Sequence, residues 1–536
     1  MGAGGRLALA VDVNTLHAAI AKADSVFAAR ARGHRVACDQ LKATYEQRDY
    51  ALLWSHLRVP TPQALAVLQT LRTADAYGLR PADYDGDEIA RRFQALASNP
   101  NATEAEWAEV DAVLACTALS FVSHLHAGRV DPRLAGFDLA AMVTPAVHAD
   151  LLEALATHPD PSAVLAAIEP QFVHYRLLKE ALAHYRVLAE DPSLTTLPPR
   201  PPATLSQGQI YAGMPALRRL LLALGDLPAS SVVPADLTLD TETVTALKRF
   251  QSLHALDTDG RLGKNTFAAL TVPLAQRVRQ IELTLERWRW LPRLDAGTII
   301  VNIPQFRLFA LRSFNDHEAD MLRMDVIVGK EYPHTQTPVF AADLKHVIFR
   351  PYWNVPYSIL RRELLPELRK NPRHLIAQHF EIVRGGGDDA TPVAITAENL
   401  NALAAGTLRL RQRPGAGNAL GLIMFMLPNP YNVYLHSTPT PQLFQHARRT
   451  FSHGCIRVSD PVALAEHVLR DTPEAWTAEK IRSAMDGKST LKVPLSKPVH
   501  VLILYGTAVA TEDGAVRFFE DIYGYDRQLE GLLGAK

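Results

Sequence analysis

The 536-residue sequence lacks the features that mark several large classes of protein. Basic and acidic side chains number 56 each, so there is no basic excess of the kind that nucleic-acid-binding proteins carry. No apolar run approaches the roughly 18 residues of a membrane span. There is also no His-Glu-x-x-His motif, no metal-binding cysteine pair and no phosphate-binding glycine loop. We therefore expect no metal, no cofactor and no nucleic-acid partner.

Cysteine is scarce, with only Cys38, Cys116 and Cys455 in the chain. Three cysteines cannot form a disulfide framework. Cys38 and Cys116 lie in helical segments rich in alanine and leucine, so we expect packed thiols, with a bridge between them as the less favoured alternative. In both cases Cys455 is left over, and an odd thiol calls for a functional explanation.

Composition and length indicate a soluble protein with several domains. Hydrophobic residues make up 48% and charged residues 21%, which is ordinary for globular proteins. A chain of this length is expected to form three or four domains. The N-terminal apolar segment, residues 7–11, is too short for the core of a signal peptide. If the protein is exported, we expect that its signal was removed or lies outside this sequence.

A histidine and a cysteine 19 positions apart are the candidate catalytic pair. Cys455 follows Ser452, His453 and Gly454, and His436 precedes this group. A thiolate is the strongest nucleophile that a side chain offers, and an imidazole can take the thiol proton. The alternative is a structural thiol, because free cysteine usually behaves as a small hydrophobic residue.

The glycine before the cysteine favours an oxyanion hole. Without a Cβ, Gly454 allows a sharp turn and lets a substrate carbonyl approach the main chain. We expect the backbone N–H groups of His453, Gly454 and Cys455 to be the donors, with the Tyr434 hydroxyl as a further candidate. Tyr434 lies two residues before His436, so both side chains would share one face of a strand.

Three roles stay open at this stage. His436 needs an acceptor that orients its ring, and without a nearby carboxylate we expect a backbone carbonyl or Ser437. Arg457 either steadies the cysteine loop or meets a substrate carboxylate. His453 acts either through its ring or only through its backbone.

These residues resemble the active-site motif of the L,D-transpeptidases, bacterial cell-wall enzymes with a cysteine nucleophile. The family pattern is a histidine, about fifteen residues, then Ser/Thr-His-Gly-Cys, a hydrophobic residue and Arg or Asn. Here the positions are held by His436, Ser452, His453, Gly454, Cys455, Ile456 and Arg457. Residues 350–356 resemble the Asn-Pro-Tyr-Trp-x-Val-Pro segment of the large Gram-negative members, with Arg350 in place of Asn. The resemblance suggests Tyr434, Trp353, Ser452, Arg457 and Asn354 as substrate-binding residues.

The resemblance implies a substrate and a location. Such enzymes form a thioester from a peptidoglycan tetrapeptide stem, release D-Ala and transfer the acyl group to a second stem in a 3→3 cross-link. Water as acceptor gives an L,D-carboxypeptidase, and a lipoprotein lysine gives protein anchoring. The alternatives are a cysteine endopeptidase and a catalytically idle wall-binding scaffold. We expect a periplasmic monomer, at most peripheral to the inner membrane, that is acylated by carbapenems and contributes to cell shape.

The periodicity of the chain predicts a multidomain α+β architecture. Residues 1–204 are expected to form a helical scaffold, with a Gly-Arg-Val-Asp-Pro turn at 128–132 that resembles the large family members. Residues 205–273 resemble a three-helix peptidoglycan-binding module, or one that has lost its ligand groove. An amphipathic helix in 274–295 returns the chain to the scaffold. Residues 296–536 are expected to form the mainly β catalytic domain, an antiparallel or mixed sandwich.

A charged segment interrupts the strands of this last domain. Residues 358–416 are predicted to be a helical capping insertion, with a glycine-rich loop at 385–387. The segment 415–421 is a near miss for a dinucleotide-binding loop, and we interpret it as a hinge. We expect the insertion to act as a lid over Cys455 that excludes water.

Overall fold

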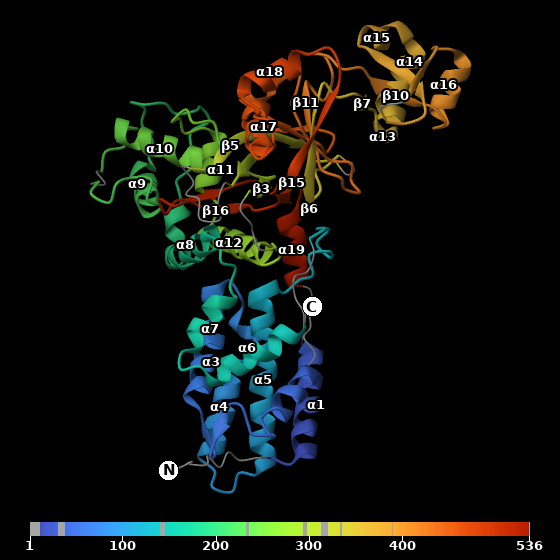
Figure 1. Cartoon of the computed structure of the whole chain (residues 1–536). Helices are drawn as coiled ribbons and strands as arrows, with labels where there is room; N and C mark the ends of the chain where they lie inside the picture. Colours follow the sequence, from blue (N-terminus) through green and yellow to red (C-terminus); the bar gives the residue numbers. More distant parts are fainter. Residues whose placement is uncertain are drawn as a thin grey trace. The chain divides into compact units, whose positions relative to one another are not determined.

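A computed structural model describes residues 11–30, 38–139, 145–231, 235–292, 297–311, 320–332, 335–387 and 390–534. The chain forms two compact units, Met1–Leu294 with Tyr505–Lys536 and Asp295–Leu504 (Figure 1). Most of the short N-terminal apolar segment, which bears on export, lies outside the described residues.

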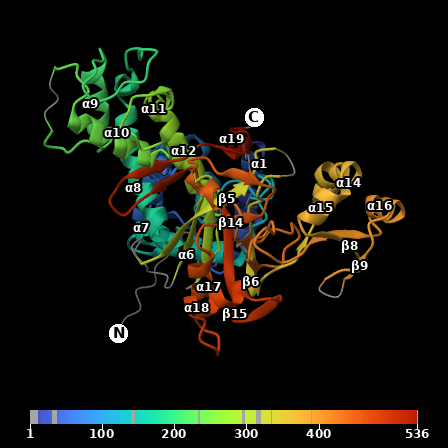
Figure 2. The ribbon, with the colours of Figure 1, turned by 90° about the horizontal axis from the view of Figure 1, so that it is seen from above.

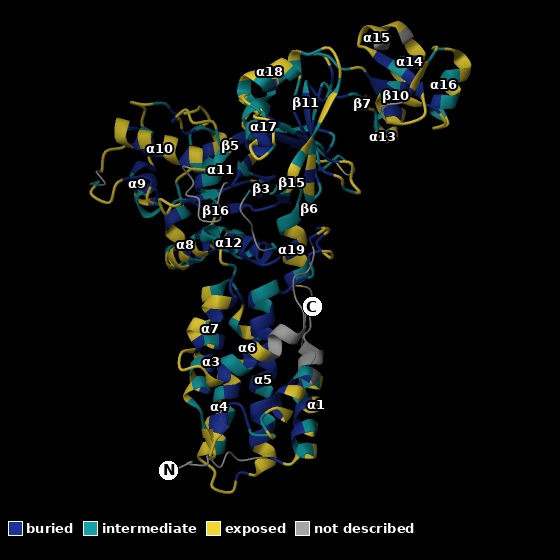
Figure 3. Ribbon diagram, viewed as in Figure 1, coloured by how far each residue is buried: buried dark blue, intermediate teal, exposed yellow. Residues whose placement is uncertain are grey.

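The first unit begins with a bundle of helices arranged around a long buried helix, α5. The helix α5 (Glu104–Ala127) starts at a capping box made by Thr103 and Glu106 and ends at Gly128, whose φ is 82°. It is long and apolar enough to cross a bilayer, but most of it is buried within the bundle, as in the core helix of a globular protein (Figure 3). Around it lie α1 (Val13–Arg30), α2 (Leu41–Glu46), α3 (Pro62–Arg72), α4 (Gly86–Ala97), α6 (Pro145–Thr157) and α7 (Pro161–Ile168). The next helix, α8 (Val173–Ala189), packs against the later helix α12 (Leu274–Trp288) instead.

Two buried features join the start of the chain to α5. Cys38 and Cys116 form a disulfide with 5.5 Å between their Cα atoms, so the expectation of two packed thiols is wrong. The carboxylate of Asp111 accepts hydrogen bonds from the hydroxyl of Tyr45 at 2.7 Å and from the backbone N–H of Trp54 at 2.8 Å. Sequence patterns missed the bridge because they do not reveal that residues 78 positions apart lie side by side.

The predicted three-helix module is confirmed. It consists of α9 (Met214–Ala223), α10 (Thr241–Leu253) and α11 (Lys264–Leu270). The buried Gln251 accepts the N–H of Gly260 at 2.7 Å and donates to the hydroxyl of Thr266 at 3.1 Å. This network ties the turn between the last two helices to α10.

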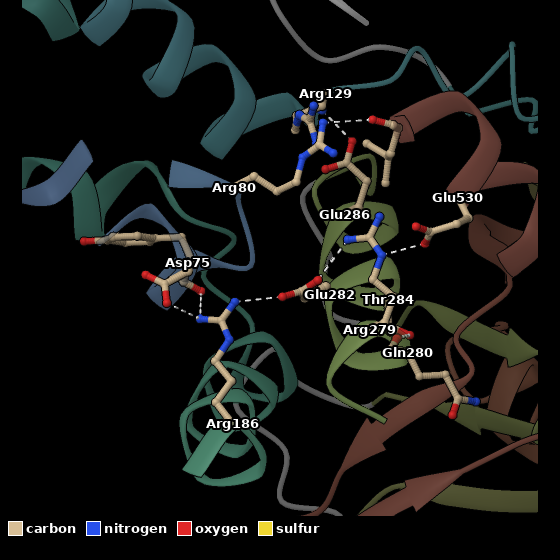
Figure 4. Close-up of polar contacts among 12 residues, drawn as sticks. Asp75, Arg80, Arg129, Arg186, Arg279, Gln280, Glu282, Thr284, Glu286 and Glu530 are labelled. Atoms are coloured by element: carbon tan, nitrogen blue, oxygen red, sulfur yellow. Dashed lines mark hydrogen bonds and ion pairs between the residues drawn. The ribbon is translucent and has the colours of Figure 1, made fainter. Parts of the chain in front are cut away.

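The helix α12 (Leu274–Trp288) carries polar side chains that bind several parts of the first unit (Figure 4). Glu286 accepts the backbone N–H of Val130 at 3.0 Å, within the Gly-Arg-Val-Asp-Pro turn. Arg186 bridges Asp75 and Glu282 at 3.2 and 2.7 Å. These contacts attach α12 to the helical bundle through a buried carboxylate, Glu286, and a partly exposed set of ion pairs around Arg186.

The C-terminal segment also packs on α12. Arg279 pairs with Glu530 at 2.5 Å, and Arg287 pairs with Asp526 at 2.5 Å. The segment comprises β16 (Ala508–Ala510), β17 (Val516–Phe518) and α19 (Tyr525–Gly534). Residues 505–534 therefore belong to the first unit. From the sequence we had expected them to be part of the catalytic domain.

The second unit is built on one mixed nine-stranded sheet (Figure 2). The strand order is β13-β5-β14-β12-β11-β6-β15-β3-β4, and β4 also pairs with β5, so the sheet closes on itself. The expected mixed pairing is found, but within a closed sheet and not in a two-layered sandwich. The strands are β3 (Ile299–Asn302), β4 (Arg307–Ala310), β5 (Leu322–Gly329), β6 (Phe340–Phe349), β11 (Ile423–Met426), β12 (Leu435–His436), β13 (Thr450–Ser452), β14 (Ile456–Val458) and β15 (Leu491–Leu504). Two helices, α17 (Pro461–Leu469) and α18 (Ala478–Asp486), follow β14, and α17 packs against β15.

The capping insertion is a mixed α/β element with its own core. Its antiparallel sheet has the order β7-β10-β8-β9, which corrects the prediction of a helical segment. The elements are β7 (Trp353–Asn354), α13 (Tyr357–Ile359), the π-helical turn η5 (Leu360–Leu364), α14 (Leu365–Lys370), α15 (Pro372–Ala377), β8 (Phe380–Arg384), β9 (Thr391–Val393), α16 (Ala397–Ala404) and β10 (Arg409–Gln412). Leu368, Leu403 and Leu410 are buried in a core separate from the large sheet. An element that buries its own apolar side chains can keep its shape while it moves.

Candidate active site

Parallel pairing of two short strands brings the candidate catalytic residues together. In this register Leu435 lies opposite Ile456, and His436 lies opposite Arg457. Cys455 immediately precedes β14, and the N–H of Ile456 donates to the carbonyl of Tyr434 at 3.0 Å. Cys455 and His436, 19 positions apart in the sequence, therefore lie diagonally across two adjacent strands.

Cys455 is half-buried and carries its proton in this state. Its thiol donates to the carbonyl oxygen of Asn432, with 3.6 Å between the sulfur and the oxygen. Burial raises the pKa of Cys455 to about 11, although a backbone hydrogen bond and the charge of Arg457 act in the opposite direction. The resting sulfur is therefore a thiol.

His436 is buried and oriented by a backbone carbonyl. Its Nδ1 lies 2.6 Å from the carbonyl oxygen of Ser437, so Nδ1 carries the proton and Nε2 is left as the basic nitrogen. The Ser437 hydroxyl accepts the N–H of Leu422 at 2.8 Å. Burial, followed by the charge of Arg457, lowers the pKa of His436 to about 4. The ring is neutral at physiological pH.

The pair is thus a thiol with a neutral imidazole. Burial opposes both charged forms, because a low-dielectric site stabilises neither a thiolate nor an imidazolium. Proton transfer from Cys455 to His436 is then favoured only when the sulfur attacks an electrophile. Such an arrangement can support general base catalysis, in which the proton moves during the attack.

Ser452 holds the cysteine loop in shape. Its hydroxyl donates to the carbonyl of Cys455 at 2.5 Å and accepts the N–H of Gly454 at 3.1 Å. Gly454 has a φ of 117°, where residues with a Cβ are strained. The N–H of Gly454 is therefore already engaged, which differs from its expected role as an oxyanion donor. Among the described residues, the N–H groups of His453 and Cys455 have no hydrogen-bond partner.

Two further candidates lie beside the sulfur. Burial and the neighbouring Cys455 raise the pKa of Tyr434 to about 12, so its phenol stays a hydrogen-bond donor. Arg457 donates from Nη1 to the hydroxyl of Thr440 at 3.3 Å, which braces the start of β14. Burial lowers the pKa of Arg457, and its positive charge acts on both His436 and Cys455.

The ring of His453 contacts the capping insertion. Its Nε2 lies 2.9 Å from a carboxylate oxygen of Glu363, and both side chains are partly exposed. Glu363 lies on the π-helical turn, a geometry that is frequent at functional sites. Glu363 could not be predicted from the sequence, because no motif links it to His453, which lies 90 positions later.

The residues of the 350–356 segment lie where the chain enters the insertion. Trp353 is half-buried and meets the ring of Phe380 edge-on in the core of the insertion. Asn354 is exposed on β7. Arg350 donates to the carbonyl of Met485 at 3.2 Å, at the end of α18, which gives this replacement a structural role.

No group of three or more His, Cys, Asp or Glu side chains that could hold a metal ion occurs in the described part of the chain. His124 meets the Tyr84 hydroxyl at 2.9 Å and His126 meets the carbonyl of Ile168 at 3.3 Å, so each has a structural contact.

Three segments of the chain match known domain families, and about half of the chain aligns with a named relative. Residues 296–482 match the model of the L,D-transpeptidase catalytic domain, residues 39–182 a scaffold domain, and residues 212–270 a domain described as a putative peptidoglycan binding domain. A Haemophilus influenzae protein named "Putative L,D-transpeptidase" is 31% identical over 252 residues, which is 47% of this chain and 49% of that protein. The alignment thus spans about half the length of this relative. Residues 296–482 are therefore similar to an L,D-transpeptidase catalytic domain, and the three matched domains together are consistent with a multidomain L,D-transpeptidase.

Proposed function

We propose that this protein is an L,D-transpeptidase that acts on the stem peptides of peptidoglycan. The observation that carries the proposal is the pairing of β12 with β14, because His436 ends β12, Cys455 immediately precedes β14, and a backbone carbonyl orients the buried His436 ring. The matched catalytic and peptidoglycan-binding domains support the choice of substrate. In this proposal residues 1–204 and 274–295 form the scaffold and 205–273 the binding module, whereas 296–504 carry the chemistry.

The first half-reaction forms a thioester. As Sγ of Cys455 attacks the carbonyl carbon of the stem amide, its proton moves to Nε2 of His436. The N–H groups of Cys455 and His453 stabilise the negative charge that develops on the carbonyl oxygen, with the Tyr434 hydroxyl as a further donor. The C–N bond then breaks, and Nε2 returns its proton to the amine of the departing D-Ala.

The second half-reaction transfers the acyl group. The side-chain amine of a second stem attacks the thioester carbon, loses its proton to Nε2 and expels the Cys455 sulfur, which takes the proton back. The product is a 3→3 cross-link. Water in place of the amine gives an L,D-carboxypeptidase, and a lipoprotein lysine gives protein anchoring.

The contact between His453 and Glu363 supports a lid role for the insertion. A segment held against the cysteine loop limits the access of water to the thioester, and so favours transfer over hydrolysis. In this role the ring of His453 fastens the insertion, while its backbone N–H serves the oxyanion. Trp353 and Asn354, at the entrance of the insertion, and Arg457 and Ser452, at the cysteine loop, would line the path of the stem.

The proposed substrate also bears on where the protein is located and on which inhibitors react with it. A peptidoglycan substrate implies an extracytoplasmic location, and we propose a periplasmic monomer, at most peripheral to the inner membrane, that contributes to cell shape. A carbapenem presents a strained carbonyl to the same thiol, so we expect it to acylate Cys455 and to add one drug mass.

Product analysis of muropeptides tests this function. Purified protein incubated with tetrapeptide muropeptides is expected to release D-Ala and to form cross-linked dimers, and Cys455→Ala serves as the inactive control. Tripeptides without dimers would indicate a carboxypeptidase, and cleavage within the stems an endopeptidase. Unchanged muropeptides would indicate a wall-binding scaffold.

A further inference from the structure

A threonine far from the cysteine motif contacts the cysteine loop directly. Thr337 follows β5 and is fully buried. Its hydroxyl accepts the backbone N–H of Gly329 at 2.9 Å and donates to the carbonyl oxygen of Gly454 at 2.8 Å. A hydroxyl has a single hydrogen, and because Gly329 supplies its own, the Thr337 hydrogen is directed at Gly454.

This contact fixes the direction of a second group. In a trans peptide the carbonyl of one residue and the N–H of the next point in opposite directions across a rigid plane. A contact that fixes the orientation of the Gly454 carbonyl therefore also fixes the orientation of the Cys455 N–H. Gly454 has a φ of 117° and no Cβ, so local sterics constrain this peptide plane weakly and an external contact is needed to set it.

The neighbouring peptides are already held by other groups. The N–H of Gly454 donates to the hydroxyl of Ser452, and the N–H of Ile456 donates to the carbonyl of Tyr434. Within 454–456, the N–H of Cys455 is the one without a partner among the described residues. It is therefore available to a substrate, and Thr337 controls where it points.

The close approach of Thr337 requires a glycine in β5. A Cβ on Gly329 would lie 1.9 Å from the carbonyl oxygen of Thr335 and 2.8 Å from the backbone nitrogen of Thr337. The absence of a side chain at Gly329 lets the 335–337 segment reach the cysteine loop.

We propose that Thr337 is a positioning residue, which aims the N–H of Cys455 at the oxyanion that forms when a substrate carbonyl is attacked. This role rests on the proposed acyl transfer. Thr337 affects the stabilisation of the oxyanion and leaves the nucleophilicity of the Cys455 sulfur unchanged. An experiment can therefore separate oxyanion stabilisation from nucleophilicity.

The test compares two reactions of Cys455 in the full-length protein. Release of D-Ala from a tetrapeptide stem passes through an oxyanion. Alkylation by iodoacetamide forms an S–C bond with loss of iodide and passes through none. Thr337→Val removes the hydroxyl with little change in shape, Thr337→Ala removes it with a smaller side chain, and Thr337→Ser keeps it.

We expect Thr337→Val and Thr337→Ala to lower kcat for D-Ala release by about 100-fold or more, the usual effect of losing one oxyanion donor, with alkylation near the wild-type rate. Thr337→Ser should restore most of kcat. Wild-type kcat in both variants without the hydroxyl would overturn the role, as would equal losses in both reactions. A wild-type protein that releases no D-Ala would overturn the proposed function itself, and this role with it.

Discussion

The neutral state of the catalytic pair can be tested through the pH dependence of thiol reactivity. Cys38 and Cys116 are joined in a disulfide, so iodoacetamide reports on Cys455 alone. Burial raises the pKa of Cys455 from its ordinary value of 9.0 to about 11. Two pH units correspond to about 100-fold less thiolate at any pH well below 9. We expect alkylation to be slow at pH 7 and to rise about tenfold per pH unit up to pH 10.

The variant His436→Ala separates the two roles that an imidazole could have. If the resting pair is neutral, the ring does not hold a thiolate, and alkylation at pH 9 should change little. The same variant should lose about 100-fold or more in acylation by a tetrapeptide stem, because the general base is gone.

The decline of the acylation rate at low pH independently tests whether His436 is neutral in the resting enzyme. Burial lowers the pKa of His436 to about 4, so the neutral base is present above this value. The kcat/KM for D-Ala release should therefore stay high as the pH falls through 6.5 and decline only near pH 4. Alkylation that is already fast and constant from pH 5 to 8, and that His436→Ala abolishes, would refute the neutral pair. It would show a preformed thiolate–imidazolium pair, whose two titrations belong to the pair as a whole.

Two further predictions concern the insertion and the scaffold. Glu363→Gln should lower the ratio of cross-linked dimer to tripeptide by up to about fivefold, because a partly exposed pair contributes at most about 1 kcal/mol. The exposed Glu367→Gln on α14 is its matched control, and equal ratios in both variants would contradict the lid role. Replacing Cys38 and Cys116 by serine should lower the free energy of unfolding of the first unit by about 2–4 kcal/mol, measured in denaturant. Alkylation of Cys455 should not change, and an unaltered stability would show that the bridge contributes nothing.

The sequence predicted features whose signals are local. The strand that ends at His436 and the Ser-His-Gly-Cys loop are each a contiguous stretch of sequence, so residue type, spacing and the resemblance to a family motif together indicated the candidate pair. The helices of the module followed from the periodicity of 214–270 and from the turn at Gly260. Because the sequence around His436 has no carboxylate, we expected a backbone carbonyl or Ser437 to orient its ring. The structure shows the backbone carbonyl of Ser437 in this role.

Features that depend on distant contacts could not be predicted. The strands β8 and β10 of the insertion have only five and four residues, too few for a clear alternation of apolar and polar side chains. The C-terminal segment packs on α12 through residues more than 200 positions away, which no local pattern reveals. Likewise, the engagement of the Gly454 N–H by Ser452 depends on the conformation of the folded loop.

Mass spectrometry of the acyl-enzyme tests the central claim most directly. The wild-type protein and Cys455→Ala, each shown to be folded by its thermal transition, are incubated with a tetrapeptide stem, quenched in acid and digested. Our account predicts that the wild type gains the mass of the stem without its terminal D-Ala, as a thioester on the peptide that contains Cys455. The variant should gain no mass and release no D-Ala. An adduct on another residue, or D-Ala release by Cys455→Ala at the wild-type rate, would contradict the assignment of Cys455 as the nucleophile.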